Sequence, residues 1–411
     1  MESRQKHVMG SLIDAAANGA WLTLARIRAY ALIFLAVGAV AIGTVFVTAN
    51  GLNDYQGRPI GTDFSNVYAA GKFVLEGKPA APFWPELQHA KEKSIFGMET
   101  PFYGWHYPPV FLALAALLAF MPYLLSLAVW QLASLALYLW SVLSIVKDGR
   151  AFLPALAFPA VFINLTHGQN GFLTASLIGG GLLLLDSSPI IAGILIGLLV
   201  YKPQFGLLIP LALIASGRWR VFCVAAVTVI AICTATYVFY GAETWIAFRE
   251  SLTFTRVAVL EQGGTGFYKI QSPFAAASLW GAPIAAAYAV QAVFTLGAAA
   301  LIVRLWRGRA SLEIKSAALI AACLFATPYS LDYDLVVMAP AIAFLALDGL
   351  KRGFLPGEKT LLAFCWFAPV VTRFIAEYTR IPLGLIALLV LFALALRRSA
   401  MHSSARPTVL A

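Results

Sequence analysis

Long uncharged apolar runs alternate with short polar connections along most of this chain. The first run covers residues 29–49, and twelve more follow a pair of prolines at 108–109. A helix needs roughly 20 apolar residues to cross a bilayer core, so this pattern predicts helices that pass repeatedly through a membrane. The later runs lie near 110–120, 123–146, 151–166, 171–185, 189–201, 203–216, 221–240, 283–303, 312–327, 335–347, 361–372 and 382–396.

The number of crossings is less well defined than the runs themselves. Several runs are shorter than a full span, so some are expected to be tilted, bent or re-entrant. A direct count gives about 13 crossings. Basic residues near the C-terminus, Arg397, Arg398 and Arg406, favour a cytoplasmic tail, and this requires an even number if the N-terminus is also cytoplasmic. We therefore expect an all-α bundle of about 12 transmembrane helices, within a range of about 11–13, in which either 110–146 crosses once or another short run does not span.

Composition excludes a soluble multidomain protein. Hydrophobic residues make up 61% of the 411 residues and charged residues only 12%, too few to cover a soluble surface of this size. We therefore treat 1–411 as one integral membrane domain. A cleavable signal peptide at the N-terminus is an alternative to a first membrane helix, but the run 29–49 is long for a signal sequence.

The net charge of +10 comes from short basic clusters between apolar runs, not from a long basic face that would indicate nucleic-acid binding. Clusters of this kind mark cytoplasmic connections, which predicts cytoplasmic ends at 1–28 and 397–411. The segment 50–107 is nearly neutral instead, and we expect it to be a first extracytoplasmic loop, with a short surface helix at 64–75. By the same alternation, a second such loop covers 241–272, and the turns near 167–170, 201–204 and 328–334 face the same side.

Asp63 is the strongest catalytic candidate because it follows the first apolar run closely. A carboxylate at the membrane surface can take a proton from a sugar hydroxyl as a general base. The alternative is structural, because Asp often caps the N-terminus of a helix such as the one expected at 64–75.

Other polar side chains stand at the same predicted level as Asp63. Each has a structural alternative: an interfacial aromatic belt for the 105–109 segment, ordinary turn polarity for 167–170, snorkelling for Lys202, helix N-terminal acids for 332–334 and a solvated connection for 241–272. The substrate-binding candidates are His106, Tyr107, His167, Gln169, Asn170, Lys202, Gln204, Arg256, Lys269, Gln271, Asp332, Tyr333 and Asp334. Asp332 and Asp334 alone are too few oxygen ligands for a metal cage, so we expect neither a metal nor another cofactor.

Five motifs in this order resemble glycosyltransferase family 87, over roughly residues 25–350. They are Gly61-Thr62-Asp63-Phe64, Tyr107-Pro108-Pro109, Gly168-Gln169-Asn170, Lys202-Pro203-Gln204 and Pro328-Tyr329-Ser330-Leu331-Asp332-Tyr333-Asp334. The family has the GT-C fold and includes polyprenyl-phosphate-mannose-dependent mannosyltransferases. One departure is that actinobacterial members often have Ser-Trp-Asp-His where this chain has Ser330-Leu331-Asp332-Tyr333, so a histidine contact to the donor phosphate is absent.

The resemblance implies an inverting hexosyltransferase of the bacterial inner membrane with an extracytoplasmic active site. Its donor would be a polyprenyl-phosphate-linked, mannose-like sugar and its acceptor a lipid or a cell-envelope glycan. In that family an acidic residue of the first extracytoplasmic loop is the base, and Asp63 matches it.

Two other functions use the same polar residues. A lipid-linked-sugar flippase or transporter would bind the donor without making a bond, but such proteins commonly carry internal repeats, and none is visible here. A scaffold subunit of a polysaccharide complex would not need Asp63, Lys202 and Asp332 together. The sequence therefore favours an enzyme.

Overall fold

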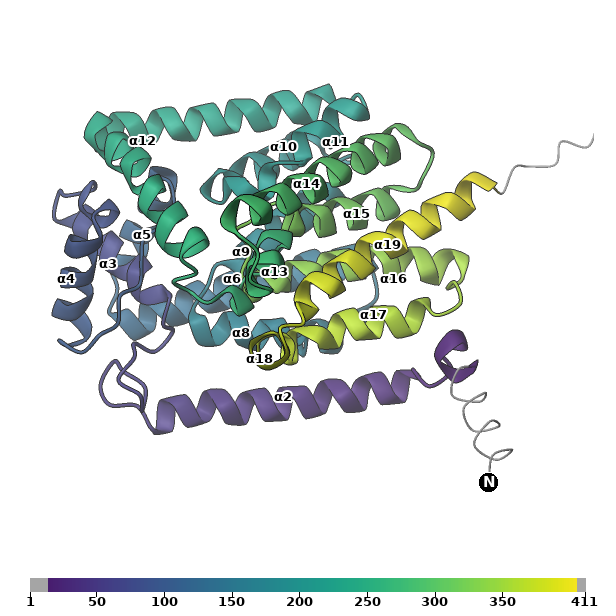
Figure 1. The fold of residues 1–411 in the computed structure, drawn as a ribbon, viewed down its shortest axis with the longest axis horizontal. Helices are drawn as coiled ribbons and strands as arrows, with labels where there is room; N and C mark the ends of the chain where they lie inside the picture. Colours follow the sequence, from purple (N-terminus) through teal and green to yellow (C-terminus); the bar gives the residue numbers. More distant parts are fainter. Residues whose placement is uncertain (1–13, 405–411) are drawn as a thin grey trace, which may run out of the picture.

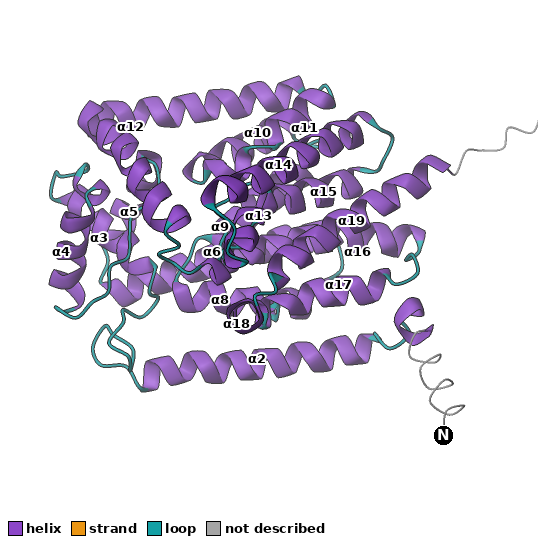
Figure 2. Cartoon of the chain, viewed as in Figure 1, coloured by secondary structure: helices purple, strands orange, loops and turns teal. Residues whose placement is uncertain are grey.

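The computed structural model describes residues 14–404, and every apolar run predicted from the sequence is helical in it. No strand occurs among these residues, only three isolated β-bridges. The all-α prediction is therefore confirmed (Figure 2). The α-helices are α2 (Leu24–Val47), α3 (Phe64–Leu75), α4 (Pro85–Phe96), α5 (Leu112–Ala119), α6 (Tyr123–Val146), α7 (Phe152–Leu156), α8 (Pro159–His167), α9 (Gly171–Leu183), α10 (Pro189–Gly197), α11 (Ile209–Ala215), α12 (Trp219–Phe254), α13 (Pro273–Leu279), α14 (Ile284–Arg307), α15 (Leu312–Phe325), α16 (Met338–Arg352), α17 (Glu358–Phe367), α18 (Thr372–Thr379) and α19 (Leu383–Ser404).

The helices differ in whether they are long enough to cross a bilayer. Within residues 14–404, six helical segments are long and apolar enough, and two bent pairs raise the number to eight if each pair is one span. The bends are 54° between α7 and α8 and 74° between the α17 segment and α18. The protein is thus a polytopic membrane protein, while a count of about 12 stays a prediction.

Burial separates a central helix from peripheral ones. In the segment that includes α16, 78% of the most apolar window is buried, compared with 11% for α2. Figure 1 shows α2 along one edge of the bundle, while α15 and α16 lie inside it. The outward side of α2 carries large apolar side chains such as Val40, which is 70% exposed. A helix that exposes such side chains over its length fits a lipid surface.

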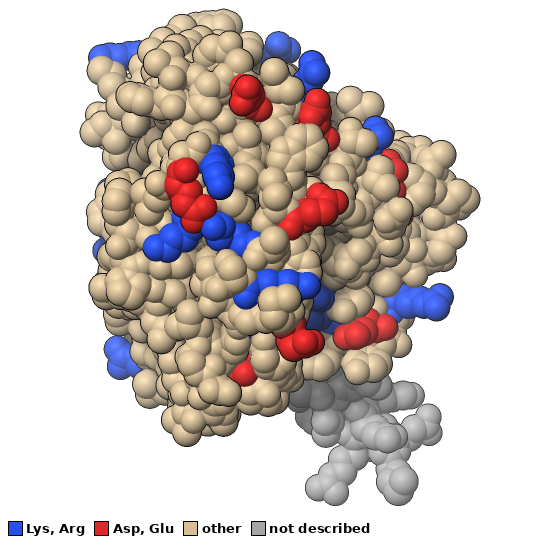
Figure 3. Space-filling model, turned by 90° about the vertical axis from the view of Figure 1, so that its left-hand side faces the viewer, with Lys and Arg blue, Asp and Glu red and all other residues tan. Residues whose placement is uncertain are grey.

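The two ends of the bundle have different charge patterns. At the end that holds the N-terminal part of α2, basic side chains pair locally: Arg218 with Asp186, and Lys351 with Glu313. The opposite end is built by the segment 50–107 with α3 and α4 (Figure 1). Figure 3 shows that end face, on which Lys and Arg are interspersed with Asp and Glu over a mostly uncharged surface. The nearly equal numbers of basic and acidic residues in 50–107 therefore correspond to a face of mixed charge.

α12 differs from the open loop expected at 241–272. Gly241 has φ 79° and ψ 165°, a conformation open to glycine but costly for other residues, and it kinks the helix. Beyond it the chain stays helical to Phe254 and continues as a π-helix over Thr255–Glu261. This second half of α12 leaves the line of the bundle and approaches the α3–α4 end, where Phe248 packs on Phe83 with ring centroids 5.7 Å apart (Figure 1).

A buried ion cluster joins α16, α17 and α19 at the end of the bundle near the N-terminal part of α2. Arg398 is 2% exposed and pairs with Asp348 and Glu358, both fully buried. Its guanidinium also donates to the Gly353 carbonyl oxygen at 2.8 Å. The loop after α16 is therefore tied to two neighbouring helices through one cation.

We expect Arg398→Gln to lower the free energy of unfolding by about 3–5 kcal/mol, because it removes the cation from buried Glu358 and leaves buried Asp348 with the more exposed Arg352. Arg397→Gln is the matched control, since Arg397 is exposed. Thermal unfolding in detergent compares the two variants. Equal melting temperatures for both would contradict a stabilising role for the cluster.

Candidate functional site

Polar segments that are far apart in sequence meet at the α3–α4 end of the bundle. The Asp63 N–H donates to the His167 carbonyl oxygen at 3.0 Å, which joins the start of α3 to the turn between α8 and α9. The Lys202 ammonium reaches Asp334 at 2.7 Å, which joins the α10–α11 connection to the segment before α16. Four of the five polar segments singled out in the sequence are thus linked in pairs, and Tyr107 joins them through its hydrogen bond to Gln169.

The Asp63 side chain does not cap α3, although it occupies the N-cap position. Its Oδ2 instead accepts a hydrogen bond from Gln169 Nε2 at 2.8 Å. Its Oδ1 accepts none from residues 14–404, and no cation pairs with the half-buried carboxylate there. The alternative that the Asp63 side chain caps α3 is therefore wrong, and its Oδ1 is available to accept a hydrogen bond from a ligand.

Gln169 is held in place from several directions. Tyr107 donates its hydroxyl hydrogen to Gln169 Oε1 at 3.2 Å, and Gln131 Nε2 donates to the Gln169 carbonyl oxygen at 3.1 Å. Gly168 has φ +63°, and a Cβ there would lie 2.6 Å from Phe64 Cβ. Only glycine allows this turn to approach α3 so closely. The amide that binds Asp63 is therefore well fixed.

Two acids near α16 are each neutralised by a cation from elsewhere. Lys202 and Asp334 are 4% and 2% exposed, so the snorkelling alternative for Lys202 is wrong. Arg373, on α18, pairs with Asp332 at 2.6 Å, and Asp332 is 3% exposed. These pairs explain how both acids stand in apolar surroundings. Sequence reasoning missed Arg373, although a lone cation between apolar residues was the signal that drew attention to Lys202.

The segment around Tyr333 is held in place by Asp334 and by backbone contacts with residues 270 and 271. Asp334 Oδ2 accepts from the Leu331 N–H at 3.1 Å, and the Gln271 N–H donates to the Ser330 carbonyl oxygen at 2.7 Å. The Lys202 ammonium lies over the Tyr333 ring, 5.4 Å from the ring centroid. Gln271 is therefore brought to the site by its backbone, while its side-chain amide donates to a carbonyl of its own loop.

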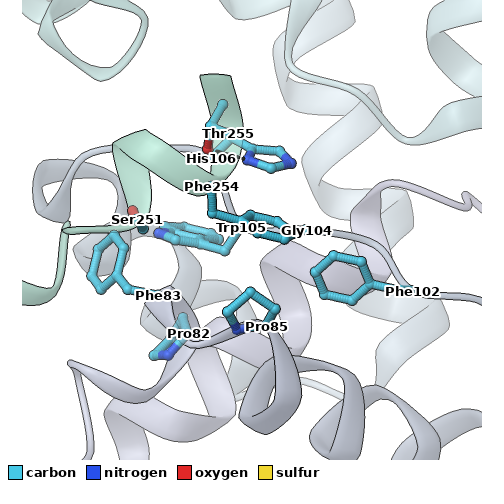
Figure 4. A pocket seen from close by; sticks show the side chains of 10 residues that line it. All are labelled: Pro82, Phe83, Pro85, Phe102, Gly104, Trp105, His106, Ser251, Phe254 and Thr255. Carbon is cyan, nitrogen blue, oxygen red and sulfur yellow. Dashed lines mark hydrogen bonds between the residues drawn. The ribbon is translucent and has the colours of Figure 1, made fainter. Parts of the chain in front are cut away.

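His106 connects the site to the distal part of α12. Its Nδ1 lies 2.8 Å from Thr255 Oγ1, and its ring centroid lies 6.3 Å from that of Tyr329. Figure 4 shows the imidazole beside Thr255 at the edge of a small pocket lined also by Phe83 and Trp105. Desolvation lowers the pKa of His106 to about 4, so the ring is neutral near pH 7.

Three predicted binding residues stand apart from the Asp63–Gln169 pair. Gln204 is half-buried after Lys202, and Arg256 is 60% exposed and lies 3.6 Å from Glu261. The Lys269 ammonium lies 5.7 Å from the Tyr268 ring centroid. Their contact with substrate stays a prediction. Among residues 14–404, no three His, Cys, Asp or Glu side chains are placed to hold a metal ion together.

A family model described as glycosyltransferase family 87 matches residues 105–330, more than half of the chain. The match includes the Tyr107, Gly168–Asn170 and Lys202 motifs. Asp63 and the acids at 332 and 334 lie outside it, so the case for them comes from the geometry above. No curated protein and no solved structure matches this chain.

Glu92, on α4, is a buried carboxyl group that the sequence did not indicate. It is fully buried and accepts a hydrogen bond from the Tyr103 N–H at 3.0 Å. Burial raises its pKa to about 8, against backbone and side-chain hydrogen bonds that lower it, and the negative charge of Asp63 adds to the increase.

We expect the α3–α4 region to lose stability as pH rises. Glu92 has a pKa of about 8 in the folded chain and 4.5 as its ordinary value, so the folded state holds the extra proton between these values. The contribution of Glu92 to stability is complete below its ordinary pKa of 4.5 and is lost as pH rises through its folded-state pKa of about 8. Melting temperatures measured from about pH 5.5 to about pH 8.5 should fall more in the wild type than in Glu92→Gln. Glu86→Gln, at an exposed position of the same helix, should follow the wild type; parallel curves for all three would contradict the assignment.

Proposed function

The chain belongs to glycosyltransferase family 87, and on that premise we propose that it is an inverting transferase of the bacterial inner membrane. Its donor is a polyprenyl-phosphate-linked hexose of the mannose type, and its acceptor is a hydroxyl group of a lipid or an envelope glycan. The family match supports a membrane glycosyltransferase. The donor, the acceptor, the stereochemistry and the sidedness are our proposals.

The observation that carries the proposal is that Asp63, unlike its neighbouring acids, has no paired cation among the described residues. The acids at 332 and 334 each have a cation within 2.7 Å, so their negative charge is already compensated. Asp63 has a neutral amide donor on one oxygen and no protein donor among the described residues on the other. A general base needs an oxygen that can accept the proton of the attacking hydroxyl. Asp63 is therefore the acid in this cluster best suited to that task.

The proposed reaction is a single displacement. The acceptor oxygen attacks the anomeric carbon while its proton passes to Asp63, and the bond from that carbon to the phosphate oxygen breaks on the opposite face. The lipid phosphate leaves with the electron pair, and the sugar carbon is inverted. Cations near the leaving group stabilise its developing charge. We assign that task to Lys202 with a basic residue of 241–272, such as Arg256 or Lys269.

The sugar hydroxyls need hydrogen-bond partners within the same cluster. Asn170 is 2% exposed, and its Oδ1 has no partner within the described chain. A buried acceptor left open is costly unless a ligand satisfies it. Together with Tyr107, Gln169 and Asp332, Asn170 supplies a set of amide, hydroxyl and carboxylate groups suited to a hexose.

The charge pattern at the two ends supports the proposed sidedness. The paired basic residues near Arg218 and Lys351 lie away from the Asp63 end, and basic connections favour the cytoplasm. We therefore place the N-terminus inside and the site outside. Family membership supports bond-making chemistry over the flippase alternative, which needs no base at residue 63.

We expect Asp63→Asn to reduce sugar transfer by at least about 100-fold, because an amide cannot accept the proton. The variant should still bind the donor, since it retains the size and one oxygen of the side chain. Glu99→Gln, exposed in the same loop, is the matched control. Transfer at the wild-type rate by Asp63→Asn would remove Asp63 from the reaction.

The donor class is tested separately in proteoliposomes. Labelled prenyl-phosphate hexoses and nucleotide hexoses are supplied in parallel with a crude lipid extract as acceptor. We expect labelled product only from a prenyl-phosphate donor, with the anomeric configuration inverted. Product from a nucleotide sugar would contradict the donor assignment, and movement of the lipid donor across the bilayer without product would favour the flippase.

A further inference from the structure

Arg373 lies on a segment that the family match does not cover. It is the second residue of α18, which follows a 74° bend after the α17 segment, and the matched residues end at 330. Its guanidinium nevertheless reaches the cluster: Nε donates to Asp332 Oδ2 at 2.7 Å, and one terminal nitrogen lies 3.4 Å from His167 Nε2. A bent element late in the chain thus brings a cation to the site.

We propose that Arg373 binds the phosphate group of the lipid-linked donor. The inference rests on the proposed function and identifies the residue that recognises the charged part of its substrate. A guanidinium presents its N–H groups in a planar fork that matches phosphate oxygens. Asp332 holds one edge of this fork, and the other terminal nitrogen, Nη1, has no partner within residues 14–404.

Exposure distinguishes Arg373 from Lys202. The Lys202 side chain is 4% exposed, paired with Asp334 and placed 5.5 Å from the Phe205 ring centroid. Direct contact between a ligand and its ammonium would require breaking a buried ion pair, so Lys202 acts on a bound phosphate through its charge and not by contact. Arg373 is 34% exposed and can contact an anion while its bond to Asp332 remains. Arg373 is therefore the cation of these two pairs that is ready to receive a phosphate.

The position relative to Asp63 suits a single displacement. Asp63 bonds the carbonyl oxygen of His167, and Arg373 contacts the imidazole of the same residue. The base and the cation are thus attached to one turn through different atoms of one residue. Inversion requires the acceptor and the leaving group on opposite faces of the sugar carbon, so the base and the phosphate site must be close but separate.

The test measures binding without transfer. Purified protein in nanodiscs is titrated with farnesyl phosphate, with farnesol as the uncharged analogue and with inorganic phosphate. We expect Arg373→Gln to weaken farnesyl phosphate binding about tenfold or more and Arg373→Lys to retain part of the affinity. Farnesol binding should not change. Arg380→Gln, an exposed arginine just beyond α18, is the matched control and should bind as the wild type does.

A double variant separates phosphate contact from neutralisation of Asp332. Arg373→Gln alone leaves a buried carboxylate unpaired, whereas Arg373→Gln with Asp332→Asn removes both charges. If Arg373 contacts phosphate, the double variant remains weak. Recovery of wild-type affinity in the double variant, or wild-type affinity in Arg373→Gln, would overturn the inference and leave the proposed function standing.

Two further outcomes concern the ligand itself. If inorganic phosphate binds as tightly as farnesyl phosphate, the inference that Arg373 binds a lipid-linked phosphate is wrong. Wild type that binds farnesyl phosphate no better than farnesol, while transferring sugar from a nucleotide donor, would overturn both the inference and the proposed donor. The transfer assay with Asp63→Asn is independent of these titrations.

Discussion

The site depends on the requirement that charge inside an apolar bundle be paired. An ionised side chain without a partner is unfavourable at membrane depth, so each acid near the start of α16 has its own cation. The partner of Asp334 precedes α11 and the partner of Asp332 lies on α18. Both pairs consequently fix the relative positions of helices that are far apart in sequence. Asp63 is outside this compensation, because it lies half-buried in the end region and not within a span.

Much of the fold could be predicted from the sequence because a membrane restricts the choices of the chain. Backbone polar groups in a bilayer must be satisfied internally, so an apolar run of sufficient length is a helix. The same rule predicted little about 241–261, which contains charged residues and became helical through α12 and its π-helix. Helices that lie along a surface or pack on a loop are not marked by an uninterrupted apolar pattern.

The candidate site was predicted in part. Asp63, Gln169, Tyr107, Lys202 and Asp334 were singled out. The structure links the first three by hydrogen bonds and, separately, pairs Lys202 with Asp334. The pairing itself could not be predicted, since it depends on how helices pack and not on local spacing. The same limit explains two omissions. Arg373 is an isolated cation in a late apolar segment, and Glu92 resembles its charged neighbours on α4 until packing encloses it.

The kink at Gly241 divides α12 into two arms with different contacts. Its first half belongs to the bundle, while its second half ends in the π-helix whose Thr255 bonds His106. His106 directly precedes Tyr107, and the Tyr107 hydroxyl orients the amide that binds Asp63. The position of the helix arm beyond the Gly241 kink and the alignment of the Asp63 carboxylate are therefore coupled through this chain of contacts.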